Sequence, residues 1–228
     1  MVGMKIVSLV PSMTETLLEW GISPVACTRF CEQPGLRHVG GTKDPDVGGI
    51  VDLAPDMVIV DAEENRREDY EALVGAGLDV TALHIRSLQD VAAQLDPLAG
   101  RLGVAWRMPE LRAAVPIGAS AFVPIWRRPW MALGAPTYGS SLLAQLGIGN
   151  VFGADSDTYP ETTLEEVTSR RPDVVLAPSE PYPFREQHRE ELEAIAPSAF
   201  VDGKDLLWWG SRTAGALERL AGLANREP

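Results

Sequence analysis

The chain has 228 residues, of which 45% are hydrophobic and 23% are charged, so it is long enough to bury a core. Its formal net charge of -12, from 32 acidic and 20 basic residues, excludes a surface built for nucleic acid or an anionic membrane, because such a surface needs clustered Lys and Arg. A neutral or cationic partner fits this charge better.

The amino-terminal residues run directly into a short apolar segment, Ile6 to Val10. This segment is too short for the hydrophobic region of a signal peptide. The chain also lacks the run of about 18 apolar residues that a membrane helix needs. As written, the sequence predicts a cytoplasmic protein without direct membrane insertion, and a trimmed start would make it periplasmic or cell-surface.

The first half alternates short apolar runs with helical patterns, which is typical of strand and helix units that build a parallel sheet. We predict strands at residues 5–10, 24–28, 57–60 and 80–84. Ser12 and Glu15 have the spacing of a capping box, in which each side chain accepts a hydrogen bond from the other residue's backbone N–H. A helix is therefore predicted to begin there and to end at Gly21.

Residues 87–112 form the connecting segment, whose apolar side chains recur every three or four positions. This spacing predicts an amphipathic helix. Pro97 removes a backbone hydrogen-bond donor, and Gly100 and Gly103 weaken helix propensity. We therefore expect a connecting helix that is bent or broken.

The second half repeats the plan of the first. We predict strands at residues 122–125, 131–134, 151–152, 174–178 and 199–201, followed by a final helix over 212–223. The predicted organisation is an amino-terminal lobe at 1–86, the connecting helix at 87–115 and a carboxy-terminal lobe at 116–228.

Two internal repeats support this organisation. The segment Pro55 to Val60 is echoed 117 residues later by Pro172 to Ala177, and Glu63 and Glu180 occupy the same place after each copy. A second echo, Pro11 to Ile22 against 136–148, has an offset of 125 to 126. The fold class predicted is α/β, with two similar lobes of parallel sheet flanked by helices and a ligand cleft between them.

Candidate ligand contacts lie in the loops that follow the strands, because ligands of parallel sheets bind outside the carboxyl ends of the strands. Eleven aromatic residues lie after position 120 and four before it, which indicates a stacking surface in the second half for a large flat ligand. The candidate ligand-binding residues are Pro11, Ser12, Phe30, Glu64, Asn65, Trp126, Trp130, Tyr138, Tyr159, Tyr182, Phe184, Trp208 and Trp209.

The sequence does not resemble that of an enzyme or a metal centre. The segment 40–43 lacks the spacing of a phosphate-binding loop, and no serine or cysteine has the context of a nucleophile elbow. The three histidines are not spaced as ligands on one helix, so we predict no bound metal ion. Cys27 and Cys31 match neither a redox CxxC motif nor a paired zinc motif, and they are expected to be ordinary, partly buried thiols.

A set of motifs in chain order resembles the cobalamin-binding branch of the helical-backbone metal receptor family, which are class III periplasmic-type substrate-binding proteins. The resemblance spans about Lys5 to Gly210. The motifs are Ile6 to Glu15, Val39 to Lys43, Pro55 to Val58, Glu63 to Asn65, Ile125-Trp126, Pro129 to Met131, Tyr138-Gly139 and Glu180-Pro181.

The resemblance implies a non-enzymatic protein that holds cobalamin, a related corrinoid or a similar large metal chelate between two lobes, with no catalytic cofactor. It also implies delivery to the permease of an ABC importer, which a glutamate on each lobe contacts. Glu63 and Glu180 are the candidates for that contact, and Glu64 and Glu68 are alternatives. Two other functions stay open: a cytosolic enzyme or chaperone that handles a corrinoid precursor or metal complex, and a receptor for a bare metal ion.

Overall fold

The structure is a computed structural model that describes residues 4–111 and 118–224. Its contacts divide these residues into two compact units. Unit 1 comprises residues 4–85, 90–108 and 209–211, and unit 2 comprises residues 86–89, 109–111, 118–208 and 212–224. The predicted boundary at 115–116 lies outside the described residues.

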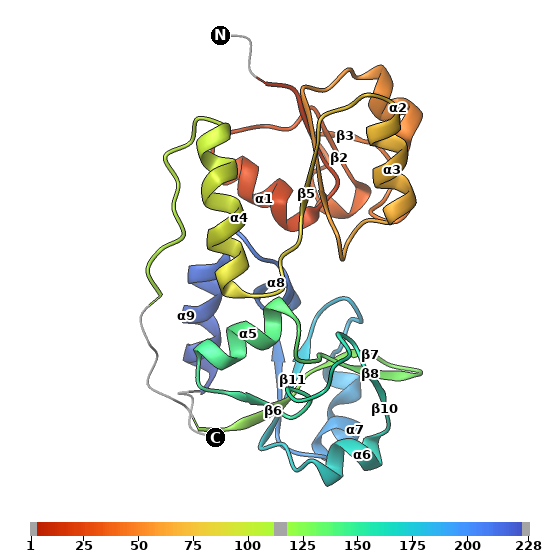
Figure 1. The fold of residues 1–228 in the computed structure, drawn as a ribbon. Helices are drawn as coiled ribbons and strands as arrows, with labels where there is room; N and C mark the ends of the chain where they lie inside the picture. Colours follow the sequence, from red (N-terminus) through yellow and green to blue (C-terminus); the bar gives the residue numbers. More distant parts are fainter. Residues whose placement is uncertain (1–3, 112–117, 225–228) are drawn as a thin grey trace. The chain divides into compact units, whose positions relative to one another are not determined.

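Unit 1 is an open parallel sheet with the strand order β3-β2-β1-β4-β5. The strands are β1 (Ile6–Ser8), β2 (Ala26–Cys27), β3 (Arg37–His38), β4 (Met57–Asp61) and β5 (Val80–Leu83). The helical elements are α1 (Pro11–Glu19), η1 (Arg29–Cys31), α2 (Val47–Asp52), α3 (Arg67–Gly75) and α4 (Leu88–Arg101). Helices α2 and α3 cover one face of the sheet, and α1 and α4 lie on the other (Figure 1).

The core beneath α2 and α3 is aliphatic. Alternate residues of the central strands, Val7 of β1 with Val58 and Val60 of β4, are fully or almost fully buried. They pack against Ile50 of α2 and Leu73 of α3, which are also buried. Because strand side chains alternate between faces, the intervening residues of β1 and β4 supply the opposite face under α1.

Helix α1 begins two residues earlier than the capping box requires. Pro11 occupies the first helical position, and the N-cap is Val10, whose side chain makes no capping hydrogen bond. Pro is favoured at this position because it has no N–H to leave unsatisfied and its φ already suits a helix. The capping box predicted at Ser12 and Glu15 is therefore wrong, whereas the predicted end of the helix near Gly21 is confirmed.

Helix α4 contains Pro97 and still runs as one helix from Leu88 to Arg101. Of the bent or broken helix that the sequence predicts, the break is wrong, because the buried apolar face that includes Val91, Leu95 and Ala99 contributes more than local propensity. The bend stays a prediction. The helix ends just before Gly103, whose φ of 73° few other residues adopt easily. Residues 112–115 of the predicted connector lie outside the described residues.

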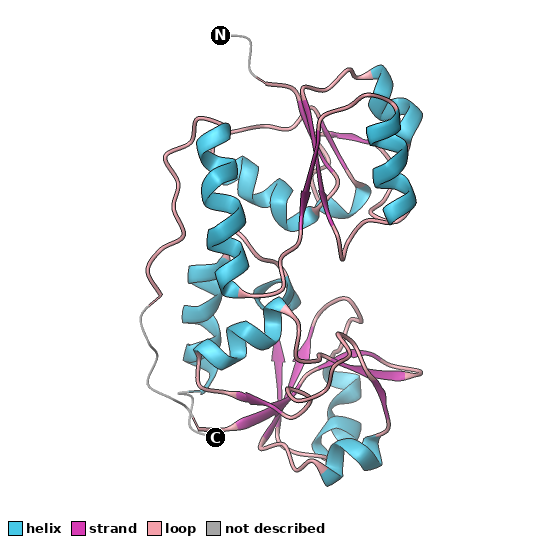
Figure 2. Cartoon of the chain, in the orientation of Figure 1, coloured by secondary structure: helices cyan, strands magenta, loops and turns pink. Residues whose placement is uncertain are grey.

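Unit 2 combines a parallel sheet in the order β12-β11-β6-β9 with a small antiparallel sheet in the order β10-β8-β7 (Figure 2). The strands are β6 (Ser120–Phe122), β7 (Pro124–Trp126), β8 (Trp130–Ala132), β9 (Gly149–Asn150), β10 (Glu161–Thr162), β11 (Val174–Pro178) and β12 (Ser198–Val201). The helical elements are α5 (Tyr138–Gln145), α6 (Leu164–Ser169), η2 (Glu186–His188), α7 (Arg189–Glu193), α8 (Gly203–Leu207) and α9 (Thr213–Ala224).

The single strand predicted over 122–125 is two strands that belong to different sheets. Phe122 ends β6 in the parallel sheet, and Pro124 begins β7 in the antiparallel sheet. Val123 between them is fully buried, and its carbonyl accepts from the backbone N–H of Leu133 at 2.9 Å. The continuous apolar run concealed this change of partner, because periodicity does not reveal which strand pairs with which.

The predicted duplication is confirmed in the hydrogen bonds of the two units. In unit 1 an Asp56 carboxylate oxygen accepts from the Lys5 N–H at 2.7 Å, and the Asp56 N–H donates to the Lys5 carbonyl at 2.8 Å. In unit 2 Asp173 and Ser120 form the same reciprocal pair, at 2.7 and 2.9 Å. The repeated Asp therefore fixes the start of the central strand pair in each unit, β1 with β4 and β6 with β11.

The second echo also has a structural role. Gly21 and Gly147 follow helices α1 and α5 with φ of 77° and 70°, which glycine adopts without strain. The next residue in each case, Ile22 or Ile148, donates its N–H back to the carbonyl of Leu17 or Leu143. Each copy thus ends its helix with the same hydrogen-bonded turn.

Candidate functional site

An aromatic chain lies on unit 2, where the antiparallel sheet meets the loop after β11. The Trp126 ring of β7 contacts the Tyr182 ring edge-on, with centroids 5.7 Å apart. Tyr182 contacts Phe184 at 4.8 Å, and Phe184 stacks on Trp130 of β8 at 5.9 Å with an interplanar angle of 10°. Four of the residues predicted to bind the ligand therefore lie in one continuous chain of ring contacts.

His188 and a salt bridge hold this aromatic chain in place. His188 is buried, and its Nδ1 accepts the backbone N–H of Arg185 at 3.0 Å while Nε2 lies 3.4 Å from the Tyr182 hydroxyl. The Arg127 guanidinium lies over the Trp130 ring at 5.8 Å and pairs with Glu191 at 2.8 Å. The rings are therefore fixed before any ligand arrives, which reduces the entropy cost of binding.

The predicted aromatic contacts separate into exposed and buried groups. Trp126 is 43% exposed and Tyr159 is 38% exposed, and Trp130, Tyr182 and Trp208 are half-buried. Phe184, Tyr138 and Trp209 are at most 5% exposed. A ligand on the surface of unit 2 can therefore contact the exposed and half-buried rings more readily than the buried rings of Phe184, Tyr138 and Trp209.

Tyr138 is held inside unit 2 at the start of α5. Its hydroxyl donates to Thr213 Oγ1 at 3.0 Å, and burial raises the pKa of the phenol. Because its one donor is used and its ring is enclosed, we assign Tyr138 a packing role between α5 and α9.

A buried carboxylate organises the segment that carries Trp208. Asp205 accepts from Arg212 at 2.8 Å and from Arg219 at 2.6 Å. Burial by itself would raise the pKa of Asp205, but the hydrogen bonds from Arg219 and Arg212 outweigh it and lower the pKa. The Lys204 ammonium and the Arg212 guanidinium lie 4.6 and 5.9 Å from the centre of the Trp208 ring. Both cations are therefore within cation–π distance of the indole.

Unit 1 presents one exposed aromatic residue at the ends of its strands. Phe30 in η1 is 50% exposed, and the Arg29 guanidinium lies 4.8 Å from the centre of its ring. Arg29 is fixed by two hydrogen bonds to Asp44, of 2.9 and 3.1 Å. Pro11 and Ser12, by contrast, are buried at the start of α1.

The Asn65 side chain fixes the loop that follows β4 through three hydrogen bonds. The Asn65 amide donates to the carbonyls of Leu9 and Thr42, at 3.2 and 2.9 Å, and its oxygen accepts the Asp61 N–H at 2.9 Å. Its side chain is 7% exposed. We therefore assign Asn65 to the support of this loop, a role that single-sequence patterns do not indicate because its partners come from two distant segments.

Asp61 completes the support of the same loop. Its carboxylate accepts the backbone N–H of Glu63 at 2.9 Å and that of Ile85 at 3.4 Å. Burial raises the pKa of Asp61, against the opposing effect of these hydrogen bonds. Lys43 Nζ donates to the Glu63 carbonyl at 2.6 Å, so the backbone that carries Glu63 is fixed from both sides.

Glu63 and Glu180 occupy matching places in the two units. Each lies two residues beyond the end of a central strand, β4 or β11, and each is half-buried. Glu180 is in van der Waals proximity to Gly203, where an added Cβ would lie 2.5 Å from the Glu180 Cγ. The absence of a side chain at Gly203 therefore makes room for the Glu180 loop, a constraint that sequence patterns did not reveal.

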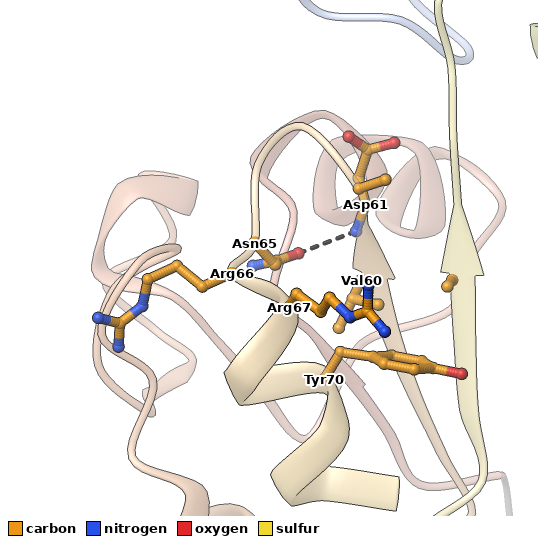
Figure 3. A pocket seen from close by; sticks show the side chains of 8 residues that line it. Val60, Asp61, Asn65, Arg66, Arg67 and Tyr70 are labelled. Atoms are coloured by element: carbon orange, nitrogen blue, oxygen red, sulfur yellow. Dashed lines mark hydrogen bonds between the residues drawn. The ribbon is translucent and has the colours of Figure 1, made fainter.

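Beside the Glu63 loop, unit 1 contains a pocket of about 310 Å³ between α3 and strands β4 and β5 (Figure 3). Its lining residues are Val60, Asp61, Ala62, Asn65, Arg66, Arg67, Tyr70 and Ala82. Arg67 and Tyr70 extend in the same direction from the first turns of α3, whereas Arg66 points away and pairs with Asp69 at 2.9 Å (Figure 3).

Residues 4–111 and 118–224 contain neither a cluster of metal-ligating side chains nor a membrane-spanning helix. No group of three or more His, Cys, Asp and Glu side chains is placed there to hold a metal ion. Within the same residues, every helix lacks the length or the apolar character that crossing a bilayer requires.

Two α/β units built on duplicated parallel sheets, each with polar and aromatic loops at its strand ends, define a binding protein of the periplasmic type. The chain belongs to the periplasmic binding protein family, which matches residues 6–198. Among curated proteins it is similar to the vitamin B12-binding protein of Vibrio campbellii, with 23% identity over 192 residues that cover 76% of this chain and 70% of the relative.

Solved structures share the fold over almost the full chain. The periplasmic vitamin B12 binding protein BtuF of Vibrio cholerae aligns with a TM-score of 0.77 and 18% identity, over 98% of both chains. A periplasmic heme binding protein from Pseudomonas aeruginosa aligns with a TM-score of 0.81 and 20% identity, over 100% of this chain and 95% of the other. The predicted family and fold class are thereby confirmed.

Proposed function

We propose that this protein binds a large metal chelate without transforming it, with a corrinoid such as cobalamin as the first candidate and haem as the second. The observation that carries this proposal is the aromatic chain of unit 2, in which Trp126 is 43% exposed and fixed against Tyr182. Flat, rigid rings provide a large contact area at low entropy cost, which suits a macrocycle. The relatives named for vitamin B12 and heme binding support the same ligand class.

We assign the ligand contacts by exposure. The proposed contacts are Trp126, Trp130, Tyr159, Tyr182 and Trp208 of unit 2 with Phe30 of unit 1, which are all exposed or half-buried. Glu64 stays in the set because its side chain is half-buried at the end of β4. Pro11, Ser12, Asn65, Tyr138, Phe184 and Trp209 are buried, and we assign them to the support of these contacts. The ligand cleft between the lobes stays a prediction.

Calorimetric titration of the purified protein tests the proposal, with cyanocobalamin and haemin as separate ligands and tryptophan fluorescence as a second readout. We expect saturable heat from at least one ligand with a Kd of about 1 µM or tighter, corresponding to a binding free energy of about -8 kcal/mol. Haemin heat without cobalamin heat would select haem as the chelate. No saturable heat from either ligand at about 0.1 mM, where even a binding free energy of roughly -5.5 kcal/mol is detected, would overturn the proposal.

We further propose that Glu63 and Glu180 contact the permease of an ABC importer. Their matched positions after β4 and β11 place one carboxylate at the same point of each unit, as a partner with two equivalent basic sites requires. In that role the protein works outside the cytoplasm, as expected from its relatives named as periplasmic.

The double variant Glu63→Ala with Glu180→Ala tests this contact. We expect chelate affinity to stay within about twofold, while affinity for the permease falls roughly tenfold or more, since losing a charged interfacial pair costs about 2 kcal/mol or more. A matched control replaces Glu19 and Glu165, which are exposed and lie away from the strand ends. Equal loss of chelate binding in the double variant would instead assign the two glutamates to the ligand site.

A further inference from the structure

His188 is a buried histidine that contacts two rings of the aromatic chain of unit 2. It is the last residue of η2, with 5% of its surface exposed. Its ring lies edge-on to the rings of Tyr182 and Phe184, with centroids 5.6 Å apart in both pairs. Because so little of His188 is exposed, it is not one of the proposed ligand contacts, and it acts on a bound chelate through the rings that it contacts.

The hydrogen bonds of His188 specify the protonation state of its ring. The Arg185 backbone N–H donates to His188 Nδ1 at 3.0 Å, and the His188 backbone N–H donates to the Arg185 carbonyl at 2.8 Å. A backbone N–H is always a donor, so Nδ1 must carry no proton. The proton of the neutral ring is then on Nε2, 3.4 Å from the Tyr182 hydroxyl. The exposed Gln187 amide lies at the same distance and can turn its oxygen toward that proton.

A second proton on this ring removes the hydrogen bond from Arg185. Histidine ordinarily changes its charge between about pH 5 and 8, and both nitrogens of the charged ring are donors. The Arg185 N–H would then point at another N–H group, and a positive charge would lie in a buried site against two aromatic rings. Burial opposes an unpaired charge, so the charged ring is expected to leave this position and to release Tyr182.

The charged groups around His188 are already paired with one another. The charged and titratable groups on the elements packed against it are Arg185, Glu186 and Arg189 at the ends of η2, Tyr182 of the loop after β11, Glu191 of α7 and Arg127 of the turn between β7 and β8. Glu186 pairs with Arg189 at 2.5 Å, and Glu191 pairs with Arg127 at 2.8 Å. Because both carboxylates are committed to arginines, they offer little compensation to a charged His188.

We propose that His188 is the positioning residue for Tyr182 and works only as a neutral ring, so that chelate binding weakens as the pH falls from about 7.5 to 5. The inference rests on the proposed function, because it concerns the affinity of the same site. The neutral ring holds Tyr182 in place before the chelate arrives, which lowers the entropy cost of binding. Affinity is therefore full above the pH at which His188 takes up its proton, and it is lost as the pH falls, by at most about tenfold per pH unit for one proton.

Calorimetric titration of the full-length protein with cyanocobalamin, or with haemin if only haemin binds, measures this dependence. We expect the Kd to be about tenfold higher at about pH 5 than at about pH 7.5. In His188→Asn the side-chain oxygen stands close to the position of Nδ1 and does not titrate, so we expect the Kd to change less than about twofold between the same pH values. His84→Asn replaces an exposed histidine of unit 1 and should keep the full dependence. Equal pH dependence in His188→Asn and the unchanged protein, or none in either, would overturn the proposal.

A further variant separates positioning from a general structural role. His188→Gln keeps a nitrogen near the position of Nε2 but takes the acceptor away from the Arg185 N–H. At about pH 7.5 we expect His188→Gln to weaken chelate binding by about fivefold or more, and His188→Asn to keep the Kd within about twofold, because it keeps the acceptor. Similar losses in the two variants would contradict the role assigned to Nδ1.

Nuclear magnetic resonance of the protein without chelate tests His188 independently of the proposed function. The amide proton of Arg185 is expected to shift between about pH 7.5 and 5 as its acceptor is lost, and this shift should be absent in His188→Asn. An Arg185 amide that does not respond to pH would overturn the inference even if a chelate binds. Absence of chelate heat at both pH values would instead overturn the proposed function, and the Arg185 amide then decides the inference by itself.

Discussion

The two units share one scaffold and differ in what is attached to it. Strands β2-β1-β4-β5 of unit 1 have the same order and direction as β9-β6-β11-β12 of unit 2. The residues that the two sequence copies share, such as the Asp before β4 and β11, form backbone-fixing hydrogen bonds. Duplicated residues therefore maintain the fold in both units, and they carry little that distinguishes one from the other.

The differences between the units carry the chemistry. Unit 2 adds the antiparallel β7-β8-β10 sheet, which supplies Trp126 and Trp130, and unit 1 adds β3 and the η1 turn that presents Phe30. The cores differ as well, because Val7 of β1 and Phe122 of β6 occupy equivalent places opposite Val58 and Val175. Ligand binding in this protein is thus expected to depend on the parts that were not duplicated.

The largest expected difference between the units is in the free energy of unfolding that is lost when an equivalent core side chain is truncated. Phe122 is fully buried against Phe152, with ring centroids 6.0 Å apart, so Phe122→Ala should lower the free energy of unfolding by about 3–5 kcal/mol. Val7→Ala removes fewer buried atoms and should cost about 2 kcal/mol. Urea denaturation measures both values, and an equal cost at the two positions would show that the cores are not organised as described.

The loops after the central strands are expected to differ less in the stability that is lost when a hydrogen-bond acceptor is removed. Asp61→Ala leaves three backbone N–H groups, those of Glu63, Glu64 and Ile85, without their acceptor and should cost about 2–3 kcal/mol, since hydrogen bonds to charged groups are the stronger ones. In unit 2 Ser179 Oγ accepts a single N–H, from Gly203 at 3.0 Å, so Ser179→Ala should cost about 1 kcal/mol. Thermal melts of the two variants check the order, and Asp61→Asn, which keeps an acceptor oxygen, is the control.

The smallest expected effect is an opposite pH dependence in the two units. Burial raises the pKa of Asp61, so its contribution is present below the unfolded pKa of about 3.9 and is lost as the pH rises through the folded pKa. Hydrogen bonds from Ser120 lower the pKa of Asp173, so its contribution is present above that unfolded value and is lost as the pH falls through the folded pKa.

The two Asn variants make this dependence measurable. Relative to the unchanged protein, Asp61→Asn should gain in Tm as the pH rises above about 4, and Asp173→Asn should lose less in Tm at about pH 3 than at pH 7. Parallel melts from about pH 3 to 7 give both differences. Curves of the same sign for the two variants would contradict the assigned environments.

Much of the fold was predictable because periodicity and repetition report on local structure and burial. Strands β1, β4, β5, β11 and β12 were found within a few residues, and the final helix was predicted within one residue at each end. What escaped prediction depends on partners distant in sequence. The division of residues 122–125 between two sheets and the continuity of α4 through Pro97 are both decided by tertiary packing.

The sequence predicts which kinds of residue form the candidate site, but it predicts their arrangement and exposure less well. The excess of aromatic residues after position 120 indicated a stacking surface, but the sequence does not say which rings stay exposed. Tyr138 and Phe184 are buried because they pack against Thr213 and Trp130 respectively, and Asn65 is fixed by carbonyls from two other segments. Burial of this kind follows from the whole fold.

The most direct test of whether the added sheet of unit 2 holds the ligand is calorimetric titration of two single variants. Each variant is titrated with the chelate that binds the unchanged protein. Trp126→Ala removes the most exposed ring of the aromatic chain, and Tyr70→Ala removes a ring of similar exposure, 36%, from α3 of unit 1. We expect Trp126→Ala to weaken binding by about tenfold, or roughly 1.4 kcal/mol, and Tyr70→Ala to leave the Kd within about twofold. Unchanged affinity in Trp126→Ala, or an equal loss in both variants, would contradict the assignment.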